Sequence, residues 1–313
     1  MGAFFIRTIT MNRSVIRKRR VGIKYLLLAL PFILLVAAFS YVPLFGWAFA
    51  FFNYKLGFKF SAMDFVGFDN FIKLFTERNE ILRVLRNTLV MSGLGILCSP
   101  LTVIFAIMLN EIGGRKFKRF VQTMTTLPNF ISWIVVFGLA FAIFSSSGLL
   151  NTILSVLHIP TSDIGIMGNG KYVWLFQLAL GIWKSMGWGA IIYIAVIAGI
   201  DSELYDAAKV DGTNRFQSII HITVPGLIPT YLVLLLLSVS NLLNNGFDQY
   251  FVFYNSLVAD KIEVLDYYVY KIGILVNDYS YSIAIGMLKT LVSIILLFTV
   301  NWISKRIRGE SLV

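Results

Sequence analysis

The chain has 313 residues, of which 58% are apolar and only 14% charged, and its mean hydropathy is +0.78. Water-soluble domains carry about 25% charged residues, so much of this surface is expected to face lipid. The net charge of +11 does not indicate nucleic-acid binding. Its Lys and Arg residues gather in short segments beside apolar runs, which is the pattern that orients helices in a bilayer.

Six apolar stretches are long enough to be transmembrane helices, since a helix crossing about 30 Å of hydrocarbon needs roughly 20 apolar residues. They are apolar on all sides, which excludes spanning strands of alternating polarity. The predicted fold class is an all-α membrane protein. The first stretch is too long for a cleaved signal and is interpreted as a retained anchor. The predicted spans are 25–47, 88–110, 121–144, 172–199, 227–243 and 283–304.

The distribution of basic residues predicts the orientation of these spans and places both termini in the cytoplasm. Basic residues precede the first span, fill the loop after the second span and follow the sixth. The external loop 145–170 contains no Lys or Arg, whereas 55–86 contains six and is expected to fold on the outer surface. The predicted organisation is a basic N-terminus (1–24), the first helix with its external loop (25–82), a five-helix core (83–304) and a cytoplasmic tail (305–313). The basic residues on the cytoplasmic side are Arg13, Arg17, Lys18, Arg19, Arg20, Arg115, Lys116, Lys118, Arg119, Lys305, Arg306 and Arg308.

Charged groups are scarce inside the spans. No Asp or Glu lies well within them, which disfavours an ion-coupled carrier, since such carriers bind the coupling ion with intramembrane carboxylates. Lys289, near the outer end of the sixth span, is expected to snorkel to the interface. Lys184 lies near mid-depth in the fourth span and needs either a wet cavity or a polar partner. Small residues Gly181, Ser185 and Gly189 share one face of that helix and predict that it lies inside a bundle.

Catalytic signatures are missing from the sequence. His158 and His221 are far apart and predicted on opposite sides of the membrane, so no metal site is expected. The segment 165–171 has the GxxxxGK spacing of a phosphate-binding loop, but Tyr172 follows where Ser or Thr would bind magnesium. It is interpreted as a turn before the fourth helix. Any nucleotide chemistry is therefore expected on a partner chain, with no cofactor bound here.

The segment 201–225 predicts a compact helix pair on the cytoplasmic face. Ser202 is expected to cap a helix that ends near Val210, and Gly212 to supply the turn. A second short helix is expected from about Thr213 and to end before Pro225. Apolar residues four apart give each helix a ridge that fits a groove in a soluble partner. The alternative is a loop that packs beneath its own bundle.

The same segment resembles a known family motif. Asp206-Ala207-Ala208, Asp211-Gly212, Phe216 and Ile222-Thr223-Val224-Pro225 resemble the EAA loop of binding-protein-dependent ABC importer permeases, approximately EAAxxDGAxxxxxFxxIxLP. Asp206 replaces Glu, Thr213 replaces Ala and Val224 replaces Leu. Segments 41–46, 66–71, 187–193, 246–247 and 284–286 resemble the polysaccharide and complex-oligosaccharide branch, which is similar to maltose permeases.

The resemblance covers most of residues 25–306 and implies a type I importer permease fold in a bacterial cytoplasmic membrane. It further implies a heterodimer with a second permease, two ATPase subunits that bind ATP and Mg, an extracellular solute-binding protein and an oligosaccharide substrate. Permeases for other small solutes and an ion-coupled carrier remain the alternatives. In the family the EAA loop is seated in a cleft of the ATPase. The residues expected to couple to the ATPase are Glu203, Tyr205, Asp206, Ala207, Ala208, Asp211, Gly212, Arg215, Phe216 and Pro225.

Candidate substrate-path residues follow from the chemistry of sugars, which are bound by aromatic stacking and by neutral hydrogen-bonding groups. Such residues gather in the fourth helix and at the end of the fifth. The alternative for the aromatic ones is anchoring at the membrane interface. If Lys184 lines the path, an acidic sugar is favoured. The candidates are Trp183, Lys184, Trp188, Tyr193, Asn241, Asn244, Asn245, Asp248 and Gln249.

Overall fold

The computed structural model describes residues 24–57, 63–159 and 165–308, and over these ranges the chain is helical apart from its turns and loops. Six helices are long and apolar enough to cross a membrane, which confirms the predicted number of spans. The one β contact within the described ranges is a bridge between Phe52 and Phe65. The predicted topogenic residues Arg13, Arg17, Lys18, Arg19 and Arg20 lie outside the described residues.

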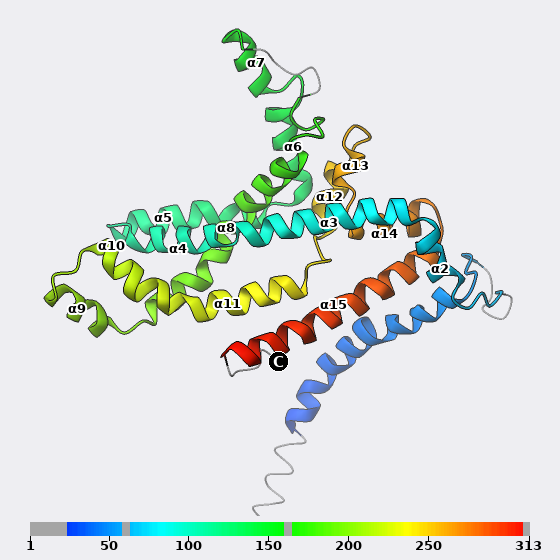
Figure 1. Cartoon of the computed structure of the whole chain (residues 1–313), viewed down its shortest axis with the longest axis horizontal. Helices are drawn as coiled ribbons and strands as arrows, with labels where there is room; N and C mark the ends of the chain where they lie inside the picture. The colour runs from blue at the N-terminus through cyan, green and yellow to red at the C-terminus, as the bar shows by residue number, and fades with distance from the viewer. Residues whose placement is uncertain (1–23, 58–62, 160–164, 309–313) are drawn as a thin grey trace, which may run out of the picture.

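The fourth span, α8 (Val173–Ala198), is the centre of the bundle and matches its predicted bounds closely. It packs against α4 (Pro100–Glu111), α5 (Arg115–Thr126) and α11 (Val224–Ser240). On the other side, α15 (Tyr279–Arg308) packs against α11 and against the 3₁₀ helix η2 (Val42–Phe51) of the first span, which begins at Lys24. In Figure 1, α4, α5 and α11 run roughly along the horizontal long axis, whereas α8 and α15 lie obliquely to it.

Three predicted spans have the wrong bounds, and one of them is the fifth, predicted at 227–243, which instead runs from Arg215 to Ser240. The second begins at Arg78 rather than residue 88, as α3 (Arg78–Cys98), and continues into α4 after Ser99. The predicted third span 121–144 is two helices, α5 and α6 (Trp133–Phe144), separated by the short η4 (Leu127–Phe130). The break falls at Pro128, which lacks a backbone N–H, and Ser132 caps the new helix by accepting from Val135 N. Figure 1 shows α6 and the following α7 (Leu149–Val156) turning away from the long axis.

Among the glycines of the described residues, the one with the least space for a side chain lies outside the predicted small-residue face. A Cβ on Gly187 would lie 2.1 Å from the Thr125 carbonyl oxygen of α5. Of the predicted face, Gly189 approaches α4, with a Cβ 3.1 Å from the Thr102 methyl, whereas Gly181 and Ser185 line a cavity described below. The absent side chain at Gly187 therefore lets α5 lie directly on α8.

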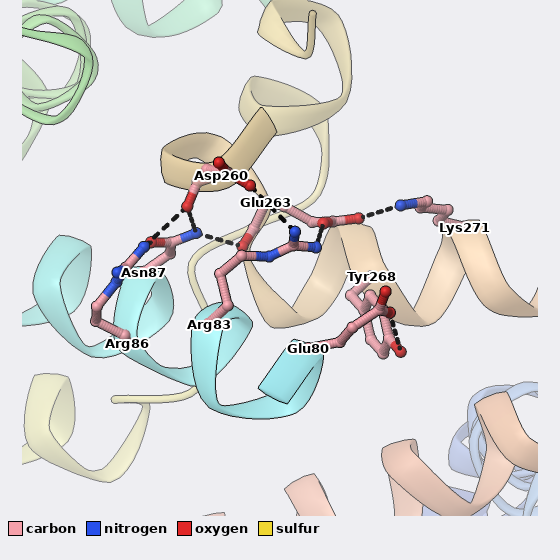
Figure 2. A network of polar contacts seen from close by, with 8 residues as sticks. All are labelled: Glu80, Arg83, Arg86, Asn87, Asp260, Glu263, Tyr268 and Lys271. Atoms are coloured by element: carbon pink, nitrogen blue, oxygen red, sulfur yellow. Dashed lines mark hydrogen bonds and ion pairs between the residues drawn. The ribbon is translucent and has the colours of Figure 1, made fainter. Parts of the chain in front are cut away.

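Between α11 and α15 the chain forms three short helices, α12 (Asp248–Phe253), α13 (Ala259–Ile262) and α14 (Leu265–Tyr270), and the π-helical turn η6 (Lys271–Leu275). A polar network joins this segment to the start of α3 (Figure 2). Glu263 is 1% exposed and accepts from Arg83 Nη2 at 2.6 Å and from Lys271 Nζ at 2.8 Å. Asn87, also buried, donates to the carbonyl oxygens of Asp260 and Glu263.

This network explains why the second span starts early. Arg83 and Asn87 lower the local hydropathy, yet both are used to satisfy a carboxylate and two backbone oxygens of the α13–α14 segment. Burial works against the charged form of Lys271, but its hydrogen bond to Glu263 and the negative charges around it together outweigh burial and raise the lysine pKa. Removing one partner of such a buried pair costs about 3–5 kcal/mol, so the network fixes α14 against α3.

Gly187→Ala is expected to separate α5 from α8, because the added methyl meets backbone atoms that cannot rotate away. Overpacking of this kind costs about 1–3 kcal/mol, so the purified protein should melt at a lower temperature. Gly93→Ala is the matched control, since its Cβ meets nothing within 4 Å in this chain. Equal melting temperatures for the two variants would contradict the close approach.

Candidate coupling loop and substrate cavity

The helix pair predicted in 201–225 begins with α9 (Ser202–Val210), which lies at one end of the long axis, beyond α11 (Figure 1). The prediction that Ser202 caps α9 is wrong. Asp201 is the cap, and its side chain accepts from Glu203 N at 2.9 Å. Aspartate at this position also places negative charge at the positive end of the helix.

The second helix of the pair does not end before Pro225, which corrects the sequence prediction. It starts as α10 (Arg215–Ser218), capped reciprocally by Asn214 and Gln217, and continues through the π-turn η5 (Ile219–Thr223) into α11. Pro225 lacks the N–H that the continuing helix would use, and the π-turn η5 ends just before it. The loop is thus continuous with the fifth span.

Two contacts shape the connection between α9 and α10. Gly212 has a φ of +75°, a left-handed conformation that favours glycine, and Thr213 Oγ1 donates to the Ala208 carbonyl oxygen at 2.7 Å. Tyr205 Oη lies 2.9 Å from Thr223 Oγ1, and Thr223 is buried at the junction with α11. The phenol therefore ties α9 to the start of the fifth span.

The pair exposes three large apolar side chains among charged ones. Leu204, Val210 and Phe216 are 53%, 88% and 68% exposed. Asp206 is also exposed, and its side chain pairs with its neighbour Lys209 at 2.8 Å. Of the other predicted coupling residues, Tyr205 and Ala208 are half-buried and the following are exposed: Glu203, Ala207, Asp211, Gly212, Arg215 and Pro225.

A cavity of about 510 Å³ lies where α3, α8, α11 and α12 meet. Trp133 and Tyr250 supply aromatic rings, and the sole cysteine of the chain, Cys98, lies on its wall. Every polar side chain that lines it within the described ranges is uncharged. These are Ser92, Ser99, Thr102, Gln177, Ser185, Ser238, Asn241, Asn244, Asn245 and Gln249, with the Tyr250 hydroxyl.

Four of the nine predicted path residues line this cavity, namely Asn241, Asn244, Asn245 and Gln249. Gln249 Nε2 donates to Gln177 Oε1 at 2.8 Å, which joins α12 to α8 across the cavity wall. The sequence prediction did not include Gln177 among the cavity residues, although an amide side chain inside an apolar run indicates a polar environment.

The other five predicted path residues lie elsewhere. Tyr193 is buried in the core with Ala106 and Leu227, and Asp248 is exposed in the first turn of α12. Trp183 and Trp188 are about half-exposed.

Lys184, the fifth of these, has a partner inside the chain. Its Nζ donates to the carbonyl oxygens of Asn129 at 2.7 Å and Pro128 at 3.2 Å, and it lies 5.5 Å from the Trp133 ring centre. These carbonyls belong to the break between α5 and α6. An unpaired carbonyl at this depth is costly, and the ammonium supplies its hydrogen bonds.

The prediction that Lys289 snorkels to the interface is wrong. Its Nζ forms an ion pair with Asp266 of α14, and both side chains are 16% exposed. The carboxylate belongs to the segment between the fifth and sixth spans. The absence of Asp and Glu from the spans therefore did not predict whether Lys289 has a partner. Because the charge is paired locally, the lysine does not need to reach the headgroups.

Comparison with known proteins defines the class. Residues 98–309 match the family described as the binding-protein-dependent transport system inner membrane component. The chain is 37% identical to protein LplB of Bacillus subtilis, covering 91% of this chain and 90% of LplB. It is 34% identical to the polygalacturonan/rhamnogalacturonan transport system permease protein YteP of the same species, covering 92% and 90%.

Two solved structures of transporter complexes contain a chain with the same fold. A bacterial ABC transporter that imports the acidic polysaccharide alginate has a chain with a TM-score of 0.82 and 31% identity, covering 93% of this chain and 97% of that one. The same type of transporter, in complex with a periplasmic protein carrying an alginate pentasaccharide, gives a TM-score of 0.83 at 31% identity, with coverage of 94% and 97%. The chain belongs to the inner-membrane component family of binding-protein-dependent transport systems and has the type I ABC importer permease fold.

Lys184→Met is expected to leave the Pro128 and Asn129 carbonyls without their donor, at about 1–3 kcal/mol for each buried unsatisfied group. The melting temperature of the purified protein should fall, and Lys184→Arg should recover most of the loss because it keeps the donors. Lys116→Met, which removes an exposed lysine of α5, is the control. A Lys184→Met protein as stable as the control would count against the bond.

Proposed function

We propose that this chain is one permease subunit of an ATP-driven oligosaccharide importer in a bacterial cytoplasmic membrane. A second, related permease completes the membrane part, two ATPase subunits bind ATP and Mg²⁺, and an extracellular binding protein delivers the sugar. The termini and the α9–α10 pair lie on the cytoplasmic side, and the five-helix core is residues 83–304. Family membership over residues 98–309 supports this organisation.

The observation that carries the substrate class is the uncharged, amide-rich cavity with its two aromatic rings. Sugar hydroxyls donate and accept hydrogen bonds, and amide and hydroxyl side chains match both roles. Apolar faces of sugar rings can pack against Trp133. Relatives that carry polygalacturonan, rhamnogalacturonan or alginate support a polymer-derived substrate. Hydroxyl groups are common to neutral and acidic sugars, and Lys184 is already bound to backbone oxygens.

The path from ATP to the cavity is a single helix. The exposed apolar side chains of α9 and α10 suit a groove on an ATPase subunit, with Asp206, Ala207, Ala208 and Phe216 at the contact. Tyr205 ties α9 to Thr223, and the helix continues from there to Ser240. Ser238 near its far end and Asn241 just after it line the cavity. Motion of the loop therefore reaches the sugar path through α11, which contains Pro229 in its interior, giving alternating access.

Oligosaccharide in the cavity is expected to shield Cys98 from N-ethylmaleimide. The assembled complex, reconstituted in proteoliposomes with its binding protein, should show several-fold slower modification of the Cys98 peptide by mass spectrometry when sugar is present. ATP-dependent uptake of labelled oligosaccharide should accompany the protection, and Cys98→Ser provides the blank. Uptake that needs an ion gradient and no ATP, or unchanged labelling, would refute the proposal.

Gly212→Asp is expected to uncouple ATP hydrolysis from uptake, because a side chain at φ +75° strains the turn between α9 and α10. Uptake should fall by about tenfold, which corresponds to about 1.4 kcal/mol of coupling free energy, while the bundle remains folded. Gly170→Asp, at a glycine with open space and no positive φ, is the matched control. Normal uptake by a fully assembled Gly212→Asp complex would exclude the coupling role.

A further inference from the structure

One carboxylate joins three elements beside the cavity. Asp266 Oδ2 accepts hydrogen bonds from the backbone N–H groups of Asn245 and Gly246, both at 3.0 Å, and Oδ1 pairs with Lys289 of α15. The aspartate belongs to α14, the two N–H groups to the turn after α11, and the lysine to the sixth span. At 16% side-chain exposure, the pair is largely removed from solvent.

The turn after α11 depends on this acceptor. The helix ends at Ser240, so Asn245 and Gly246 have no helical carbonyl for their N–H groups, and Gly246 has a φ of +85°. Asn245 is half-buried and Gly246 is exposed, and a backbone N–H that is shielded from water requires a partner. A carboxylate that accepts two of them forms charge-assisted bonds, which are roughly twice as strong as neutral ones. The position of Asp266 therefore determines the path of the turn.

The same turn presents amides to the cavity. Asn244 and Asn245 line it, and Asn245 Nδ2 donates to Ser92 Oγ at 2.8 Å on the facing helix α3. Asp266 does not line this cavity but is on the wall of a smaller one, of about 290 Å³, with Asn244 and Lys289. Its effect on a ligand in the larger cavity is thus exerted through the turn.

Lys289 makes the buried carboxylate tolerable. A buried ion needs a counter-charge, because leaving it uncompensated is strongly destabilising. The lysine also connects the turn to α15, so the amides that face the cavity are held relative to the fifth span, α14 and the sixth span together.

We propose that Asp266 is a positioning residue for substrate recognition, holding the Asn244–Asn245 turn in the geometry that binds the oligosaccharide. This inference rests on the proposed function and deepens it. The hydrogen-bond acceptor at position 266 performs this role, and Lys289 balances its charge.

Two charge-neutral double variants separate the acceptor from the ion pair. Asp266→Asn/Lys289→Met keeps an oxygen that accepts from both N–H groups, whereas Asp266→Leu/Lys289→Met has similar bulk and no acceptor. Asp278→Asn is the matched control, since Asp278 also pairs with a lysine, Lys73 at 2.6 Å, and accepts a backbone N–H, from Tyr281 at 3.2 Å. Neither Asp278 nor Lys73 lines the large cavity.

The measurement is the oligosaccharide concentration that half-protects Cys98 in the reconstituted complex, together with ATP-dependent uptake. The Asp266→Leu/Lys289→Met variant is expected to raise this concentration by about tenfold, which corresponds to about 1.4 kcal/mol of binding free energy. Its ATP-dependent uptake should also fall. The Asn/Met pair and Asp278→Asn should stay near wild type. A structural defect alone would lower the melting temperature without separating the two double variants in half-protecting concentration.

Equal half-protecting concentrations for the two double variants overturn the inference while leaving the importer intact. If the complex with Asp266→Leu/Lys289→Met fails to assemble, the Asp266→Glu variant tests the positioning role instead. It keeps the charge but moves the carboxylate by one methylene, so wild-type protection refutes positioning and weakened protection supports it. Absence of protection and uptake in the wild-type complex removes the proposed function, and the inference with it.

Discussion

The constraint behind this structure is that backbone groups inside a bilayer have no water to bond to, so each interruption of a helix needs a partner from the protein. The chain interrupts its helices repeatedly, and polar side chains meet three of these breaks, one beside the fourth span and two in the segment between the fifth and sixth spans. Lys184 binds the carbonyls exposed between α5 and α6. Asp266 binds the N–H groups after α11. Thr88 accepts from Leu265 N at 2.8 Å where α14 begins.

The same breaks create the site. The cavity lies where α11 stops and the α5–α6 connection bends away, so its wall combines helix faces with turn residues such as Asn244. Lys184, Asp266 and Lys289 are each engaged in holding a turn. What remains for the cavity itself is neutral hydrogen-bonding groups and aromatic rings, which is the chemistry suited to a hydroxyl-rich ligand.

In the proposed mechanism, continuity between the loop and the fifth span determines how a movement of the α9–α10 pair reaches the cavity. Had the second helix ended before Pro225, a flexible joint would have separated the loop from the bundle. Instead the π-turn Ile219–Thr223 carries the helix past the proline, and Tyr205 secures α9 to it. Helix α11 packs against α8, and α8 is in turn held closely against α5 at Gly187.

The sequence by itself determined the number of spans, the bounds of the fourth helix and the presence of a helix pair at 201–225, because hydropathy and motif spacing are properties of consecutive residues. It also supplied four of the residues that line the cavity. Only the tertiary structure decided that Lys289 pairs with Asp266, that Lys184 serves the break at Pro128, and that Gly187 rather than Gly189 makes the closest contact. Hydrogen bonds and steric contacts act over a few ångströms between residues far apart in the chain, and local pattern does not encode which of them meet.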